Sequence, residues 1–368
     1  MKKNVWFALD VRYPTEKAYG VTTNFTANAI QNLGGYDVTV ITPKLDNRFS
    51  SSVNSFEIRM PFDKIREFGL KQNHVISKLT FNAWKYLYPL KLFKVIKRKD
   101  NLIWLRDIRM SLIFCFFRYK VVCEIHREPS IISKFELKIL NSMSNATMAV
   151  ISDELRTKLK LNYKNSVIAP MSVNENELIR EVKNHDSEKF VVGYVGSIHS
   201  SGNKLSIEIL LEAARFLEKT DPIIEFRLIG FSIEDIDGHN GESYPDNIKF
   251  FGRLSRTELL RELDLFNVGL VIYPDTKYFF DSFPIKIVEY AARRIPIIAS
   301  KTRAHQRILG KDKALYFELN SGASLIQCIS ELATNEGIGQ LISENGFNWV
   351  KYLTYENRAQ KILTIANF

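Results

Sequence analysis

Two carboxylates eight positions apart, Asp281 and Glu289, flank a proline in the segment DSFPIKIVEYAA. Proline is favoured in the first turn of a helix, and Pro284 therefore predicts that a helix opens between the two acids. The first N–H groups of a helix attract anions, and a carboxylate beside them accepts two hydrogen bonds from a vicinal diol. The pattern suits a site for a phosphate or sugar oxygen and for vicinal hydroxyls. Its alternative is an acid that stabilises the helix start and a solvent-facing Glu.

A second candidate anion site lies in GYVGSIHSSGNK, residues 193–204. A strand is expected to end at Gly196 and Ser197, a polar loop follows, and Lys204 is expected to open a helix. A lysine and loop amides at a helix start hold a diphosphate, although the same strand–loop–helix pattern is common in proteins without such a site. The glycine spacing fits neither a dinucleotide fingerprint nor a P-loop.

Two further candidates lie in the first half of the chain. Gly20 is expected to end a loop before a helix over residues 21–33, which suits either an anion nest or an ordinary turn. His126 follows an apolar strand, where it could bond a sugar hydroxyl, transfer a proton or serve the structure alone. Histidine, cysteine and carboxylate residues do not recur with metal-ligand spacing, and we predict no metal site formed by protein side chains.

The positive charge of the chain is concentrated in its first half. Residues 1–175 carry 28 Lys and Arg against 15 Asp and Glu, a net +13, whereas the remaining residues carry 23 against 26, a net −3. A basic half predicts an anionic partner. The segment 78–120 combines Lys and Arg, including the run 97–99, with Trp, Tyr and Phe. It suits an anionic membrane, a lipid diphosphate, single-stranded nucleic acid, or a solvated helix face over a core.

Short apolar runs alternate with helical patterns along the chain, which is the rhythm of parallel α/β sheets. Near-continuous Val, Ile and Leu in these runs predict sheets that are covered on both faces. The expected strands form two series: residues 4–10, 36–42, 101–107, 119–126 and 146–152, and then residues 189–197, 224–230, 248–252, 268–274 and 295–300.

A polar, charged stretch over residues 174–189 separates the two series and is typical of a linker. We therefore predict two doubly wound, Rossmann-like domains that face each other across a cleft, residues 1–173 and 174–351. A C-terminal helix over about 352–368 is expected to pack back on the first domain. Ligands of open α/β sheets bind at the carboxyl ends of the strands, where these candidates would meet.

The cysteines and the apolar runs bear on where the protein is found. Three cysteines without metal-ligand spacing favour free thiols in a reducing compartment. The N-terminus has no signal-peptide core, and the apolar run 111–117 is too short to span a bilayer. The expected location is therefore the cytoplasm, without a transmembrane helix.

Taken in order, these motifs resemble those of GT-B glycosyltransferases of family 4, the retaining class that uses nucleotide sugars. The resemblance covers most of the chain and is strongest over residues 189–300. There, Asp281-x7-Glu289 before PIIAS is similar to the family's paired-acid motif, and SFPIKIVEY is similar to the form found in members that build bacterial surface polysaccharides. The chain departs from the usual pattern at several positions, with Asp281 in place of Glu and Ser197 in place of Arg, so the resemblance leaves the sugar open.

The resemblance implies a role for each candidate residue. Glu289 would accept hydrogen bonds from the ribose hydroxyls, Asp281 would hold the donor-sugar hydroxyls, and His126 would lie beside the donor sugar. Lys204, with Gly196 and Ser197, would bind the diphosphate. The remaining implied contacts are Gly20 and Val21, which would close over the diphosphate from the first domain; Gly252 and Arg253, beside the base; the backbone at Ser282, Phe283, Pro284 and Ile285; and Lys286.

The implied activity is a retaining, metal-independent transfer of a sugar from a nucleotide-diphosphate donor to a glycan, which we expect to be lipid-linked. The implied process is lipopolysaccharide or capsule synthesis at the inner face of the cell membrane, with an anionic membrane surface as partner and no cofactor and no nucleic acid. Two alternatives remain open: a GT-B-type nucleotide-sugar epimerase, and a nonenzymatic nucleic-acid-binding protein, which leaves the paired acids unexplained.

Overall fold

The computed structural model describes residues 2–15, 18–46, 51–59, 75–97, 101–179, 188–200, 203–204, 207–236 and 244–368. The chain forms two compact units: unit 1, Met1–Ser172 with Tyr355–Phe368, and unit 2, Val173–Thr354. Two expected features fall partly outside the described residues, namely Arg98 and Lys99 of the basic run and residues 180–187 of the linker.

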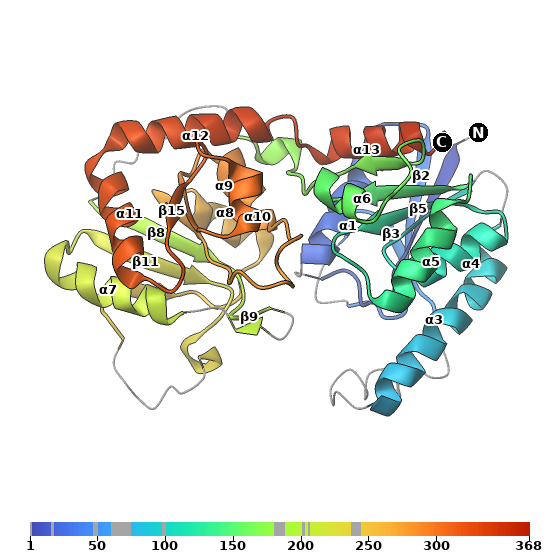
Figure 1. Ribbon diagram of the computed structural model, residues 1–368, viewed down its shortest axis with the longest axis horizontal. Coiled ribbons are helices and arrows are strands. Elements are labelled where there is room, and N and C mark those ends of the chain that lie inside the picture. Colours follow the sequence, from blue (N-terminus) through green and yellow to red (C-terminus); the bar gives the residue numbers. More distant parts are fainter. Residues whose placement is uncertain are drawn as a thin grey trace. The chain divides into compact units, whose positions relative to one another are not determined.

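Unit 1 is built on a parallel sheet of buried, apolar strands. Its strands are β1 (Lys3–Ala8), β2 (Tyr36–Thr42), β3 (Asn54–Glu57), β4 (Asn101–Leu105), β5 (Lys120–Ile125), β6 (Ala146–Val150) and β7 (Ser166–Ile168). Its helices are α1 (Ala18–Asn32), α3 (Val75–Val95), α4 (Ile108–Phe116), α5 (Ile131–Asn141), α6 (Asp153–Lys158) and α13 (Tyr355–Ile365). The sheet has seven strands in the order β3-β2-β1-β4-β5-β6-β7. Figure 1 shows unit 1 with its helices α1, α4, α5 and α13 labelled. Every residue of β4 and β6 is buried, as expected of a sheet covered on both faces.

The C-terminal helix α13 belongs to unit 1, although about 180 residues of unit 2 precede it in the chain. It packs against α1 and β7, and Tyr355, Ile362 and Leu363 on it are buried in the unit 1 core. Burying a large apolar side chain contributes about 1.5–3 kcal/mol. The end of the chain therefore stabilises the sheet formed by its beginning.

Unit 2 repeats the α/β pattern on a smaller sheet. Its strands are β8 (Phe190–Val195), β9 (His199–Ser200), β10 (Asn203–Lys204), β11 (Ile224–Ile229), β12 (Ile248–Phe250), β13 (Val268–Val271), β14 (Ile297–Ser300) and β15 (Leu315–Phe317). Its α-helices are α7 (Glu208–Thr220), α8 (Arg256–Leu263), α9 (Ile285–Ala292), α10 (Arg303–Leu309), α11 (Gly322–Thr334) and α12 (Glu336–Val350), with short 3-10 helices at Glu175–Glu177 and Ile233–Asp235. Six strands form a parallel sheet in the order β12-β11-β8-β13-β14-β15.

Two glycines in the centre of this sheet let α9 and its neighbours approach closely. A Cβ atom at Gly193 would lie 1.8 Å from the ring of Phe266, and one at Gly269 would lie 2.5 Å from the ring of Tyr290. The hydroxyl of Tyr290 accepts a hydrogen bond from the backbone N–H of Val195 at 3.1 Å. The position of α9 over β8 and β13 is therefore set by a buried tyrosine of the sequence DSFPIKIVEY.

The predicted α/β class with two doubly wound parallel sheets is confirmed. Two local expectations are wrong. Lys204 does not open a helix, because it pairs with His199 in an antiparallel hairpin and α7 begins only at Glu208. Gly20 does not end a loop, because α1 begins at Ala18; glycine is needed there because a Cβ atom would lie 2.6 Å from the backbone oxygen of Thr15.

Candidate functional site

Three glycines follow neighbouring strands of unit 2 and form a floor of bare backbone. Gly196, Gly230 and Gly252 come after β8, β11 and β12, with φ angles of +155°, +109° and +59°. The N–H of Gly230 donates to the Gly252 oxygen at 2.6 Å, and a Cβ atom at Gly230 would lie 2.5 Å from the Gly196 oxygen. Positive φ and close packing both favour glycine. The carboxyl edge of the sheet is therefore open to a ligand that approaches the backbone.

The helix between the two acids is present, with a small difference at its start. It begins at Ile285, so Pro284 is the residue before the first turn rather than within it, and no side chain caps this end. Ser282 does not cap it either, because its hydroxyl donates to the Phe279 oxygen at 2.8 Å. Asp281 lies in the preceding turn and is 7% exposed. The N–H of Ile287 donates to the Pro284 oxygen at 3.1 Å, but the N–H groups of Ile285 and Lys286 have no partner among the described residues and are left to an outside acceptor, as expected of an anion site.

Lys286, on the first turn of α9, has an unusual environment. Its side chain is 5% exposed, and Nζ has no hydrogen-bond partner among the described residues. Nζ lies over the ring of Tyr194, 4.1 Å from the centroid, and 5.2 Å from that of Tyr273. Burial lowers the pKa of Lys286 to about 7, against the opposing effect of Glu289. The surroundings of Lys286 therefore favour the neutral amine more than water does.

Glu289, the second acid, is fixed by a half-buried arginine. Arg256, the first residue of α8, pairs with Oε1 of Glu289 and with both oxygens of Glu177, its Nε lying 3.1 Å from Glu177 Oε1. Burial alone would lower the pKa of Arg256, but the two carboxylates raise it above its ordinary value. For the other oxygen of Glu289 the described residues provide no hydrogen bond. The carboxylate is therefore oriented, with one oxygen available to a diol.

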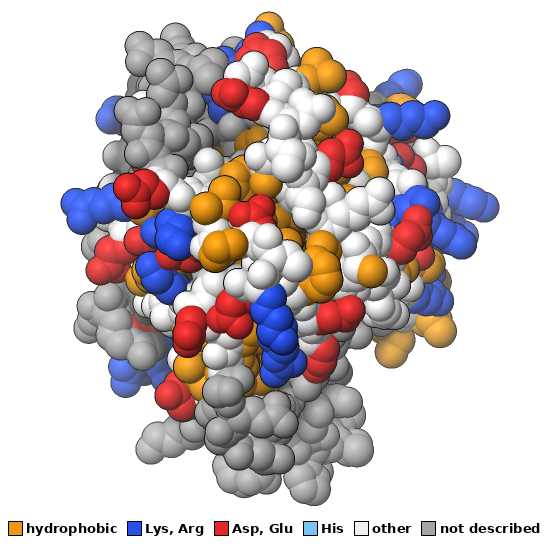
Figure 2. Space-filling view, turned by 90° about the vertical axis from the view of Figure 1, so that its left-hand side faces the viewer, with side chains coloured by type: hydrophobic (Ala, Val, Ile, Leu, Met, Phe, Trp, Pro, Cys, Tyr) orange, Lys and Arg blue, Asp and Glu red, His pale blue; other side chains and the backbone are white. Residues whose placement is uncertain are grey.

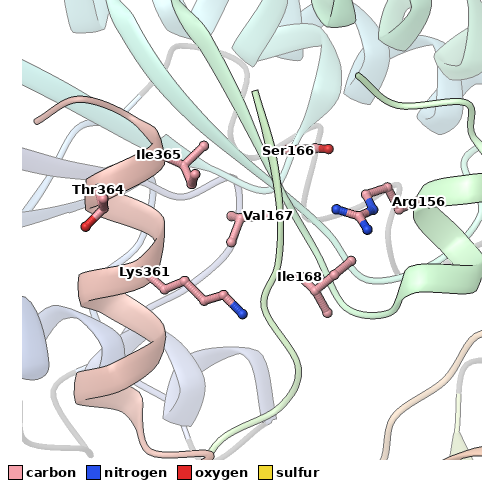
Figure 3. Close-up of a pocket in the computed structure, with 7 residues that line it drawn as sticks. All are labelled: Arg156, Ser166, Val167, Ile168, Lys361, Thr364 and Ile365. Atoms are coloured by element: carbon pink, nitrogen blue, oxygen red, sulfur yellow. The ribbon is translucent and has the colours of Figure 1, made fainter. Parts of the chain in front are cut away.

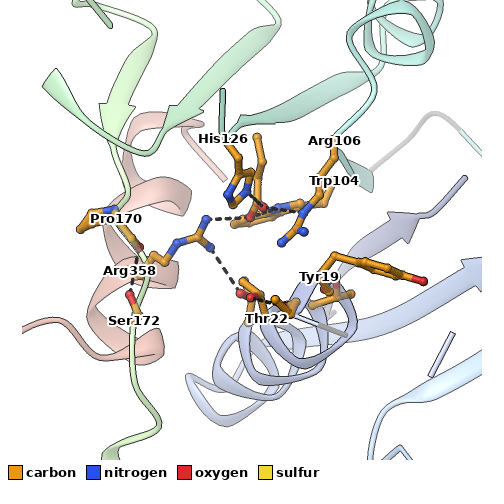
Figure 4. Close-up of polar contacts among 12 residues, drawn as sticks. Tyr19, Thr22, Trp104, Arg106, His126, Pro170, Ser172 and Arg358 are labelled. Carbon is orange, nitrogen blue, oxygen red and sulfur yellow. Dashed lines mark hydrogen bonds and ion pairs between the residues drawn. The ribbon is translucent and has the colours of Figure 1, made fainter. Parts of the chain in front are cut away.

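In unit 1, His126 belongs to a network around the buried Glu124 (Figure 4). Glu124 accepts hydrogen bonds from Trp104 Nε1 at 2.8 Å, Arg106 Nε at 3.0 Å and Arg358 Nη2 at 2.9 Å, and His126 Nε2 lies 2.9 Å from it. Burial would raise the pKa of Glu124, but Arg358, Arg106 and His126 lower it well below its usual value. Burial, with Arg106, lowers the pKa of His126, against the effect of Glu124.

The remaining candidates fall at different places. Ser197 and Arg253 are exposed beside Gly196 and Gly252, on the glycine floor of unit 2. Lys204 lies in the β9–β10 hairpin, where the structure describes its backbone only. Gly20 and Val21 lie in the first turn of α1, in unit 1. The structure thus brings the unit 2 candidates to one edge of a sheet.

Sequence reasoning missed several residues of these two clusters. Tyr194 was not singled out within the strand before Gly196, Gly230 stands in an ordinary strand–loop junction, and Arg256 follows a serine that caps α8. Glu124 and Arg106 also lay in expected strands. A charged residue within an otherwise apolar strand, as in VVCEIH, does predict a buried ion pair, because buried charges are almost always paired.

Two other findings concern what lies outside these clusters. A shallow hollow of about 480 Å³ lies between α13, β7 and α6 in unit 1 (Figure 3), and it is lined by none of the candidates but by Arg156, Ser166, Val167, Ile168, Lys361, Thr364 and Ile365. The described residues contain no group of three or more His, Cys, Asp or Glu side chains placed to bind a metal ion. No helix in that part of the chain is both long and apolar enough to cross a membrane.

Comparison with known proteins identifies residues 189–335 as a match to the family model of glycosyl transferases group 1. Solved structures match along the whole chain. Sucrose-phosphate synthase from Thermosynechococcus elongatus is 15% identical with a TM-score of 0.70, covering 100% of this chain and 98% of that one. WaaG, a glycosyltransferase involved in lipopolysaccharide biosynthesis, is 11% identical with a TM-score of 0.68, covering 98% and 99%.

HepE of Anabaena, solved in complex with UDP and glucose, is 13% identical with a TM-score of 0.66, covering 100% of each chain. At such identities the likeness shows the fold, and the predicted GT-B fold is confirmed. No curated protein has a sequence that matches this chain.

Proposed function

Residues 189–335 belong to the group 1 glycosyltransferases, and from this premise and the GT-B fold we propose that the chain is a retaining glycosyltransferase acting on a nucleotide-sugar donor. The observation that carries the proposal is the arrangement at the carboxyl edge of the unit 2 sheet. There an uncapped helix start, an oriented carboxylate at Glu289 and a glycine floor are combined. A site for a nucleotide sugar must bind the diphosphate anion, accept hydrogen bonds from vicinal diols and allow close contact with the backbone.

Each element has a part in donor binding. Glu289, held by Arg256, accepts hydrogen bonds from the ribose hydroxyls, and Asp281 holds hydroxyls of the sugar. The amides from Ser282 to Ile285 contact the sugar and the diphosphate, and the backbone of Gly252 and Arg253 packs against the base. Ser197, directly after Gly196, and Lys204, in the hairpin that follows, would bind the diphosphate. A uracil base is the first to test, because HepE was solved with UDP.

For the residues of unit 1 the proposal rests on the family resemblance. His126 would lie beside the donor sugar, and Gly20 and Val21 would contact the diphosphate. The network around Glu124 supports a positional role for His126, because it fixes the ring through Nε2. Burial lowers the pKa of His126, so the proposed form near neutral pH is the uncharged imidazole, which donates from one nitrogen and accepts at the other.

The proposed reaction proceeds on the face of the sugar from which the diphosphate leaves. The bond between the anomeric carbon and the phosphate oxygen breaks, and its electron pair goes to the diphosphate. The acceptor hydroxyl attacks the same face, and its proton passes to the departing phosphate. Stabilisation of the developing negative charge is then the main task of the protein, and helix amides and lysine supply it without a metal ion.

We further propose that the acceptor is a lipid-linked glycan of a lipopolysaccharide or capsule pathway, reached at an anionic membrane surface at the inner face of the cell membrane. On α5, Ile131, Ile132 and Phe135 are 87%, 67% and 67% exposed, and Lys134 and Lys138 lie exposed among them. Helices α3 and α5 both pack against α4 (Figure 1), which ends in exposed Phe116 and Phe117. Exposed apolar residues with lysines suit a membrane surface.

The face of the molecule shown in Figure 2 differs from the α5 surface, since acidic and basic side chains are interspersed on it.

Flotation with vesicles of phosphatidylglycerol and phosphatidylcholine tests the membrane proposal. The wild type is expected to float with the vesicles, and Ile131→Asp/Ile132→Asp is expected to stay behind. Leu341→Asp, at a residue that is 62% exposed in unit 2, is the matched control and is expected to float. Equal flotation of the Ile131/Ile132 variant would contradict the proposal.

Nucleotide binding tests the donor site. Thermal unfolding is measured with UDP, GDP, ADP and CMP, because a ligand that binds only the folded state raises the midpoint. One of the diphosphates is expected to raise the midpoint of the wild type. Glu289→Gln is expected to remove this ligand-induced rise, and the loss of its ion pair with Arg256 is expected to lower the midpoint of the free protein. Glu331→Gln, exposed on α11, serves as the control. Stabilisation by oligonucleotides alone would contradict the proposal.

Transfer itself has a separate readout. Incubation with the donor and a lipid-linked acceptor is expected to yield a glycoside whose anomeric configuration, read by NMR, is that of the donor sugar. The activity is expected to survive EDTA. A product that is only an isomerised nucleotide sugar would instead indicate an epimerase.

A further inference from the structure

A buried lysine without a hydrogen-bond partner requires an explanation. An ammonium group loses its hydration when it is buried, and without a compensating partner this costs several kcal/mol. Lys286 Nζ is in this position, and so is a neighbour: Tyr194 Oη is also buried and has no hydrogen-bond partner in the described part of the chain. Two unsatisfied donors at one place indicate a ligand with acceptor oxygens.

Both donors lie beside Gly196. A Cβ atom at Gly196 would lie 2.9 Å from Lys286 Nζ and 3.0 Å from Tyr194 Oη. Because Gly196 has no side chain, Nζ and Oη can both lie against the backbone at this glycine. Lys286 also stands on the uncapped first turn of α9, so the same place receives backbone amides.

We propose that Lys286, together with the Tyr194 hydroxyl, binds the diphosphate of the donor and carries the charge of the leaving group. This inference rests on the proposed function and assigns the leaving-group cation to α9 rather than to the hairpin residue Lys204. As the glycosidic C–O bond breaks, its electron pair moves to the phosphate oxygen, and the ammonium of Lys286 balances this charge. Lys286 retains its own protons throughout, and the acceptor's proton goes to the diphosphate.

The charges of the groups that face Lys286 determine how a bound diphosphate changes the pKa of Lys286. Burial raises the pKa values of Tyr194, Tyr273 and Tyr290, so these tyrosines are neutral, and burial lowers the pKa of His305 to about 4, so it is neutral as well. Glu289 is the carboxylate that acts on Lys286, and it is already paired with Arg256. A bound diphosphate adds negative charge and raises the pKa of Lys286. Donor binding at a pH above about 7 therefore takes up a proton.

Calorimetric titration with UDP and with uridine separates the diphosphate from the rest of the nucleotide. Lys286→Met keeps an unbranched apolar stem that reaches as far as Cε and removes the ammonium group. It is expected to weaken UDP binding about 10- to 100-fold and to leave uridine binding unchanged. Lys249→Met, at an exposed position of β12, is the control and is expected to bind both ligands as the wild type does.

Proton uptake gives a second test that does not depend on a variant. At pH 8.5 the phosphates of UDP are fully ionised, so protons taken up from the buffer on binding are bound by groups of the protein. Titrations in buffers of different ionisation heat are expected to show close to one proton taken up by the wild type and none by Lys286→Met. Near-zero uptake by the wild type would overturn the inference.

The outcomes distinguish this inference from the function on which it rests. If the wild type binds no nucleoside diphosphate, the proposed function fails. If it binds UDP, and Lys286→Met binds UDP equally well while Lys204→Met does not, the donor site stands and the leaving-group cation is Lys204.

Discussion

Units 1 and 2 each bury a charged cluster near the carboxyl ends of their strands, and the two clusters differ in how well their charges are matched. Around Glu124, four donors from the ends of strands β4 and β5 and from the C-terminal helix satisfy one carboxylate. Around Lys286, a cation and a hydroxyl are left without hydrogen-bond partners among the described residues. A satisfied buried network stabilises and specifies a fold, whereas an unsatisfied one is suited to an incoming ligand.

The Glu124 network is expected to give the largest effect on stability. Glu124→Gln leaves Arg358 and Arg106 without a buried counter-charge, and breaking such a pair costs about 3–5 kcal/mol. Denaturation followed by tryptophan fluorescence checks this, because Trp104 donates to Glu124. Glu154→Gln, exposed on α6, is the control. A loss below about 1 kcal/mol would mean that the network does not hold α13 to the sheet.

The Glu124 network also predicts that the stability of the folded protein decreases at acidic pH. The pKa of Glu124 is lowered in the folded state, so its contribution is fully present above the unfolded value near 4.5 and is lost as pH falls below it. Unfolding midpoints measured from pH 6 to pH 3 are expected to fall more steeply for the wild type than for Glu124→Gln. Parallel curves would contradict the assignment.

Lys286 is expected to give an effect of opposite sign. Replacing an unpaired buried charge by an apolar side chain of similar volume is stabilising by about 1–4 kcal/mol, so Lys286→Met should unfold at a higher temperature than the wild type. The folded pKa is about 7 and the unfolded value is 10.5, so the penalty is fully present below pH 7 and disappears as pH rises to 10.5. A difference in midpoint that does not shrink between pH 7 and pH 10 would count against this account.

Arg256 is expected to give the smallest effect of the three. It acts on the donor only through Glu289, so Arg256→Met is expected to raise the KM for the donor about tenfold and to change kcat little. Arg256→Lys, which keeps one charge–charge contact, is expected to restore part of the affinity. A variant with an unchanged KM and a lowered kcat would show that Arg256 does not orient the ribose carboxylate.

Much of the fold was predictable because its signals are local. The buried strands are short apolar runs with few alternatives, and Pro284 places the start of α9 to within one residue. What sequence reasoning could not find depends on pairs brought together by strand order. Arg256 is 79 positions from Glu177, and Arg358 is 234 positions from Glu124. Lys204 lies in a hairpin and not at a helix start because β10 pairs with β9, a contact that the local sequence pattern does not specify.

A crystal structure with a bound UDP-sugar would show whether unit 2 binds the activated sugar at the start of α9. The account predicts that the ribose hydroxyls lie within hydrogen-bond distance of Glu289 and that a phosphate oxygen contacts Lys286 beside Gly196. A nucleotide found elsewhere, with Glu289 and Lys286 unchanged from the free protein, would contradict it.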